Sequence, residues 1–138
     1  MFLPFICINS FLKKINMQIE KSLKFNKTFS EHTIVEEAKE LLCQFLNTNL
    51  YDIHDMLFSY HYAKRERVYD IIIEKSDIIY SEGKGYFTVK YMIGFFNACA
   101  DLDFNDKEKM KITYDIDFVK DDIVLKGEYI PGEEQHEI

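Results

Sequence analysis

Apolar residues recur at helical spacing in the first half of the chain. Between residues 35 and 46 they return every three or four positions, and charged residues fill most of the positions between them. Thr33 and Glu36 have capping-box spacing, in which a hydroxyl and a carboxylate satisfy free N–H groups at the start of a helix. The pattern predicts one main amphipathic helix over residues 35–46, which Asn47, Thr48 and Asn49 end.

Residues 50–62 fit two patterns at once. Leu50, Ile53 and Leu57 have the spacing of a second helix. The aromatic residues at positions 58, 60 and 62 alternate with polar ones, as in a strand. The sequence therefore leaves both structures open for this segment.

From residue 68 onward the apolar period is two, which is typical of β-strands. The predicted strands are residues 68–73, 78–80, 86–96, 110–118 and 123–129. Residues 91–96 are apolar on both faces, which indicates either a covered central strand or a subunit contact. Residues 18–29 are only weakly strand-like. The second half of the chain thus predicts a meander of three to five antiparallel strands.

These elements predict an α+β fold, with one main helix packed on an antiparallel sheet in a cystatin-like or hotdog-like outline. The 138 residues suit one domain, and no linker or repeat divides them, so we expect a single domain over residues 1–138. We expect residues 1–16 to be either a packed extension or a mis-assigned start, because Met17 opens a segment that reads as an ordinary N-terminus. Residues 131–138 are expected to form a flexible acidic tail.

The charge of the chain narrows the classes of partner. It has 24 Asp and Glu against 17 Lys and Arg, which gives a formal net charge of −7. Such a surface repels phosphate backbones, so a nucleic-acid partner is disfavoured. Residues 1–12 are apolar but too few to span a bilayer, which takes about twenty residues, so a membrane partner is disfavoured as well.

Neither a metal site nor a cofactor site is predicted. Residues 101–106 begin like a calcium loop, but Asp106 replaces the required glycine and Ile112 replaces the closing glutamate. Residues 83–85 (Gly-Lys-Gly) are too short to form a phosphate-binding loop. The three cysteines are dispersed without a C-x-x-C pair, which argues against a zinc ribbon and predicts a reducing, cytoplasmic location.

No catalytic residue is predicted either. His54 and His61 are candidate bases, but no serine or cysteine has the sequence context of an activated nucleophile. Cys99 with His61 is the pairing to inspect first, and its simpler interpretation is a buried thiol and a surface histidine. An enzyme is therefore the less favoured class.

The end of the chain resembles a known type of protein. Residues 127–134 read Gly-Glu-Tyr-Ile-Pro-Gly-Glu-Glu. This segment resembles the closing strand and tail of small accessory proteins encoded by bacteriophages and mobile elements. The resemblance implies a compact accessory or structural protein that acts in the cytoplasm of a host cell by binding host or viral proteins.

The leading hypothesis is a non-enzymatic protein-binding module that contacts a protein partner or self-associates. Its candidate interface combines aromatic residues of the long apolar strand with acids of the last hairpin: Tyr86, Tyr91, Phe95, Asp115, Asp117 and Asp121. One alternative is an enzyme or small-ligand binder with a pocket between helix and sheet. Another is an inhibitor whose acids imitate the phosphates of a nucleic acid.

Overall fold

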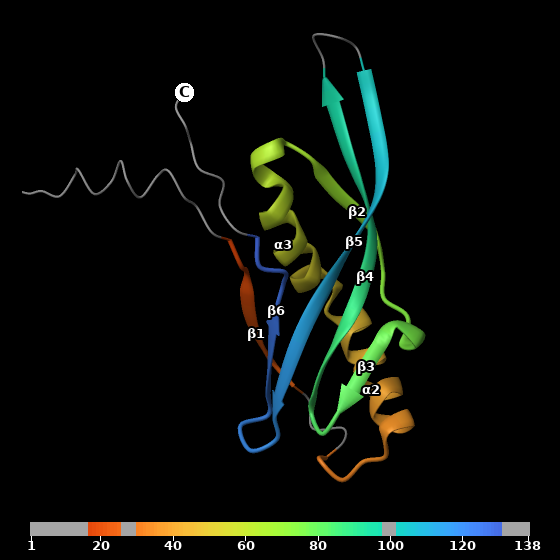
Figure 1. The fold of residues 1–138 in the computed structure, drawn as a ribbon, viewed down its shortest axis with the longest axis vertical. Helices are drawn as coiled ribbons and strands as arrows, with labels where there is room; N and C mark the ends of the chain where they lie inside the picture. The colour runs from red at the N-terminus through yellow and green to blue at the C-terminus, as the bar shows by residue number, and fades with distance from the viewer. Residues whose placement is uncertain (1–16, 26–29, 98–101, 131–138) are drawn as a thin grey trace, which may run out of the picture.

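The computed structural model describes residues 17–25, 30–97 and 102–130, with the backbone alone at residues 96, 97, 102 and 103. Its elements, in chain order (Figure 1), are β1 (Glu20–Lys24), α2 (Val35–Thr48), α3 (Leu50–His61), η1 (Tyr62–Lys64), β2 (Arg67–Ile72), η2 (Lys75–Asp77), β3 (Ile78–Ser81), β4 (Lys84–Asn97), β5 (Leu102–Asp117) and β6 (Asp122–Lys126). The predicted α+β class and the antiparallel sheet are confirmed.

The sheet has six strands, all in antiparallel pairs, in the order β1-β6-β5-β4-β2, and β3 also pairs with β4. β2 and β3 share one edge of β4: β2 lies beside residues 90–94 and β3 beside residues 84–87. The predicted count of three to five strands is therefore too small. The weakly patterned β1 adds a strand at the far edge because it pairs with β6 along its whole length.

Two helices, rather than one main helix, pack on the same face of the sheet (Figure 1). The ambiguous segment forms α3, because residues at helical spacing, including Ile53 and Leu57, become buried while Phe58 and Tyr62 stay exposed. No helix in the described part of the chain is long and apolar enough to cross a membrane.

The start of α2 differs from the prediction. Its N-cap is Ile34, which lies after Thr33, and no side chain caps the helix. The Thr33 hydroxyl instead accepts a hydrogen bond from the backbone N–H of Ser30 at 2.9 Å. Ala38, Leu42 and Leu46 are the buried residues of this helix.

The core lies between the helices and the inner face of the sheet, which we define as the face toward α2 and α3. Side chains of β4 and β5 alternate, so every second one points inward. The fully buried residues include Leu42, Leu46, Ile53, Leu57, Phe87, Val89 and Ile112. Burying one such side chain stabilises the fold by roughly 1.5–3 kcal/mol.

β4 and β5 continue beyond the helices as a two-stranded hairpin that projects from the body of the molecule (Figure 1). Along β5 the inward positions are buried from Met110 to Ile116, but Phe104 in the projecting part is 50% exposed. On β4, Gly94 lies beneath Arg67, whose guanidinium would stand 2.5 Å from a Cβ atom at this position.

We expect Leu42→Ala to lower the free energy of unfolding by about 2–5 kcal/mol, because it leaves a cavity at a fully buried site. Val35→Ala is the matched control on the same helix, since Val35 is 48% exposed, and it should change stability by less than about 0.5 kcal/mol. Denaturant unfolding followed by circular dichroism measures both. Equal losses in the two variants would show that α2 packs differently.

Candidate functional site

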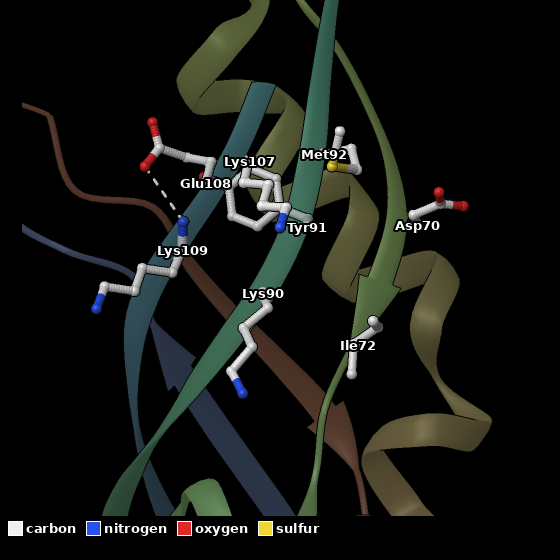
Figure 2. A pocket seen from close by; sticks show the side chains of 8 residues that line it. All are labelled: Asp70, Ile72, Lys90, Tyr91, Met92, Lys107, Glu108 and Lys109. Carbon is white, nitrogen blue, oxygen red and sulfur yellow. Dashed lines mark hydrogen bonds between the residues drawn. The ribbon is translucent and has the colours of Figure 1, made fainter. Parts of the chain in front are cut away.

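The face of the sheet that points away from the helices carries a cluster of lysines. We call it the outer face. Its side chains on β4 and β5 are Tyr86, Thr88, Lys90, Met92, Asn105, Lys107, Lys109, Lys111 and Thr113, at positions that alternate with the buried ones. The helices lie behind the strands in Figure 2, which looks onto this face.

A hollow of about 600 Å³ opens on the outer face (Figure 2). It is lined by Asp70, Ile72, Lys90, Tyr91, Met92, Lys107, Glu108 and Lys109. At its rim β2 contains a bulge between Tyr69 and Ile72, where three steps along β2 match two along β4. A bulge bends its strand locally, and Asp70 within it adopts a φ of 53°. Ile72 is left 50% exposed beside the hollow.

The lysines of the outer face differ in their partners. Lys90 lies 3.2 Å from Asp77 and 3.4 Å from Glu74, and hydrogen bonding and charge attraction to these carboxylates raise its pKa. Neither Lys107 nor Lys109 forms an ion pair with any residue that the structure describes. Glu74 and Asp77 offset the charge of Lys90, so the unpaired positive charge of the hollow lies on Lys107 and Lys109.

Cations cover both tyrosines of the outer face. The Lys111 ammonium lies 4.2 Å from the centroid of the Tyr86 ring, and the Arg67 guanidinium lies 5.7 Å from that of Tyr69. The Tyr69 hydroxyl also donates a hydrogen bond of 2.6 Å to Asn105 Oδ1. These rings are therefore engaged within the protein.

The three aromatic candidates of the sequence lie on two faces. Tyr86 is half-buried on the outer face. Tyr91 points inward and is 3% exposed, and Phe95 shares that inward phase near the end of β4. Tyr86 occupies an even-numbered position of β4, whereas the other two occupy odd-numbered positions, so alternation along the strand places them on opposite faces.

The three acidic candidates gather at the opposite end of the sheet from the projecting hairpin. Asp115 is exposed and pairs in register with Lys84. Asp117 accepts hydrogen bonds from the backbone N–H groups of Val119 and Lys120, and the bond from Lys120 is the larger cause of its lowered pKa. Asp121 follows in the same turn with a φ of 59°. Asp117 therefore organises the β5–β6 turn.

His61, a candidate base in the sequence, lies in a buried polar network. Its Nδ1 is 2.7 Å from Glu66 Oε1, and its Nε2 is 2.8 Å from the Tyr91 hydroxyl. The network joins α3 to β4 and leaves both ring nitrogens engaged. Cys99, its predicted partner, lies outside the described residues. His54 is engaged separately, with Nε2 3.1 Å from the Val68 carbonyl oxygen.

The described residues contain no group of three or more His, Cys, Asp or Glu side chains placed to hold a metal ion.

The structure adds two features that the sequence analysis did not single out. The first is the row of lysines at positions 107, 109 and 111, which share one face of the sheet. The predicted strand began only at residue 110, whereas β5 begins at Leu102. The available signal was that Lys107 and Lys109 continue the period of two of Lys111. The second feature is Tyr60, whose hydroxyl accepts from the Ile19 N–H at 2.9 Å and donates to the Glu128 carbonyl oxygen at 2.8 Å.

Comparisons with known protein families, curated proteins and solved structures find no match for this chain. Inferences about its function rest on its own side chains. The arrangement on the outer face provides positive charge next to exposed apolar surface, which is the chemistry of a binding site for an anionic group on a partly apolar molecule.

The buried phenol of Tyr91 makes stability depend on pH in the alkaline range. Burial is the main cause that raises its pKa above the ordinary value of 10.0, because it disfavours the phenolate. Above about pH 10 the unfolded state loses a proton that the folded state keeps. The contribution to the free energy of unfolding is therefore full below about pH 10 and falls as pH rises further.

We expect Tyr91→Phe to be less stable than the native protein by about 1 kcal/mol at neutral pH, because His61 Nε2 loses its hydrogen-bond partner. The same variant should show a smaller fall in stability between about pH 8 and pH 11. Tyr51→Phe, at a residue 77% exposed, is the control and should leave both values unchanged. Denaturant unfolding at about pH 8 and about pH 11 measures both values. A fall in the free energy of unfolding as large in Tyr91→Phe as in the native protein would contradict the expectation.

Proposed function

We propose that this chain is a non-enzymatic protein-binding module whose outer face binds an acidic segment of a partner protein. The observation that carries the proposal is the pair Lys107 and Lys109, whose ammonium groups form no ion pair with any described carboxylate and which lie beside Ile72 and Met92. Unpaired cations next to exposed apolar side chains favour a partner that brings both acids and apolar contacts.

The distribution of charge supports a local rather than a general attraction for acids. The chain as a whole carries −7. The helices contribute to this, since α2 has acids in its first turn at Glu36 and Glu37, and α3 has Asp52 and Asp55. The lysines instead gather on the outer face, so an acidic segment is attracted to that side of the molecule.

The apolar lining of the hollow adds contact area. Ile72 is half-exposed, and Met92 offers a flexible thioether side chain that adapts to different partner surfaces. The methylene stems of Lys107 and Lys109 can cover apolar groups of a partner while their ammonium groups pair with its carboxylates.

A protein partner fits this face better than a nucleic acid. Single-stranded nucleic acids stack bases on free aromatic rings, but Lys111 and Arg67 already cover the rings of Tyr86 and Tyr69. The lysine row from 107 to 111 spans only about 13 Å at the rise of a strand. A longer polyanion would also meet the acids of the β5–β6 end and the negative charge of the whole chain.

The two alternative functions receive less support. A cystatin-like or hotdog-like cup would need open space between helices and sheet, where Leu42, Phe87 and Ile112 are fully buried. A phosphate-mimicking surface would need free acids, but Asp117 caps its own turn and Asp122 pairs with Lys24 at 3.0 Å. Action through a host or viral protein, as the resemblance of residues 127–134 implies, agrees with the binding module.

We expect the double variant Lys107→Glu with Lys109→Glu to bind a peptide of alternating glutamate and valine at least about tenfold more weakly, because attraction becomes repulsion. Lys64→Glu with Lys120→Glu is the matched control, since these exposed lysines lie outside the hollow and the net charge changes equally. Fluorescence anisotropy at low and high salt measures the affinity, which should weaken as salt rises.

Two results would contradict the proposed function. One is equal affinity of both double variants for the peptide, which would place binding elsewhere. The other is tighter binding of a single-stranded oligonucleotide than of the peptide under the same conditions, which would assign the outer face to nucleic acid.

A further inference from the structure

One backbone edge of β5 lies open beside the lysine row. β5 runs from Leu102 to Asp117, but β6 pairs with it only over residues 113–117 (Figure 1). No strand that the structure describes pairs with residues 105–111 on that side, and we call this segment the open edge. A strand in this position presents backbone N–H and C=O groups that another strand can use.

The odd-numbered residues of β5 direct their N–H groups to the open edge. Even-numbered residues face the other way, as the hydrogen bond of 2.8 Å from Ile116 N–H to the Gly83 carbonyl oxygen shows. The N–H groups of Lys107, Lys109 and Lys111 therefore point away from β4.

A carboxylate accepts each of these three N–H groups. Lys107 N–H donates to Asp106 Oδ1 at 2.8 Å, and Lys109 N–H donates to Glu108 Oε1 at 3.2 Å, a bond drawn in Figure 2. Lys111 N–H donates to Glu128 Oε2 at 2.9 Å. Three successive outward donors of one strand are thus satisfied by side chains in place of carbonyl oxygens.

Such carboxylates protect the edge without closing it. Asp106, Glu108 and Glu128 are all exposed, so each can turn from the backbone into water, where its charge is well solvated. An incoming strand would then place its carbonyl oxygens where the carboxylate oxygens lie now. This is the geometry of strand addition to a sheet edge.

We propose that the acidic partner segment binds as an added antiparallel strand along the open edge, an inference that rests on the proposed function. Every pair in this sheet is antiparallel, and that arrangement is the more stable one for an added strand. In it, residues opposite Lys107, Lys109 and Lys111 project their side chains onto the outer face, where glutamates meet the lysines.

A second copy of this chain does not fit the same edge. Pairing two open edges would bring the lysine row of one copy against that of the other. It would also set Asp106 and Glu108 against the same acids of the second copy. Like charges on adjacent strands are destabilising, so the occupant is a segment with acids on its outer side and no acids on its inner side.

The test uses three forms of the alternating glutamate–valine peptide with the full chain. In an antiparallel added strand, residues opposite the lysines direct their own N–H groups to β5, so the glutamate N–H groups face the open edge. N-methylation of the glutamates should weaken binding at least about tenfold, whereas N-methylation of the valines should leave affinity within about threefold. Both forms carry the same charge.

Hydrogen exchange gives a direct reading of the edge. Addition of the unmethylated peptide should slow exchange of the backbone N–H groups of Lys107, Lys109 and Lys111, which the carboxylates leave near solvent. The N–H group of Ile112, which faces β4, should keep its rate.

A substitution in the protein tests the same contact. Lys109→Pro removes an outward N–H group and leaves the ladder to β4 intact, since proline is tolerated where the N–H of an edge strand faces solvent. Lys109→Thr is the matched control, because it removes the same charge and keeps the N–H group. We expect the proline variant to bind the peptide at least about tenfold more weakly than the threonine variant.

The outcomes separate this inference from the proposed function. Equal binding of the two methylated peptides, or loss of binding with methylated valines alone, overturns the antiparallel added strand and leaves binding of acidic segments standing. Failure of the unmethylated peptide to bind overturns both. If the proline variant does not fold, as circular dichroism would show, the methylated peptides decide.

Discussion

The pairing of β4 with β5 is the constraint on which the rest of the structure depends. The two strands pair over all 14 residues of β4, and side chains alternate along both. The register of this pair therefore decides which side chains lie on each face of the sheet. Phe87 and Ile112 point into the core, and their neighbours Thr88 and Lys111 point outward. A shift by one residue would place lysines against the helices, so the burial of the inner face specifies the register strongly.

The same register sets the chemistry of the outer face. It puts Lys90 directly opposite Lys109, and like charges in that position repel each other. Glu74 and Asp77, in the β2–β3 connection, offset the charge of Lys90, whereas the Lys109 ammonium forms no ion pair among the described residues. A bound acid would offset the charge of Lys109 in the same way, at the place where binding is proposed.

Local pattern predicted much of this fold, and long-range contact explains what it missed. Period two over residues 110–116 identified the strand and its buried face, because alternation in a half-buried strand is a strong signal. Residues 50–61 stayed ambiguous because their aromatic residues fit both periods, and packing of Ile53 and Leu57 decided for a helix. The strand role of β1 depends on β6, about one hundred residues later, and no local pattern reports such a partner.

The binding surface was less predictable than the fold. The lysines of β5 were visible as an alternating row, but their proximity to Lys90 and Ile72 comes from the pairing of three strands. The phase that buries Phe87 also separates Tyr86 from Tyr91, and extending that phase along β4 would have divided the aromatic candidates correctly. The hydrogen bonds from backbone N–H groups to carboxylates depend on side-chain conformation, and no simple period in the sequence reports that conformation.

Acids on the helices and lysines on the opposite face of the sheet separate charge of opposite sign across the described part of the molecule. In the field of an acidic partner, such as the one proposed, this separation of charge would rotate the molecule while it diffuses, so that its lysine face would arrive forward more often than chance would allow. The placement of charge then acts before any contact forms, by reducing the number of unproductive collisions. Selection on the rate of encounter can therefore act on residues far from the contact itself, including the glutamates at the start of α2.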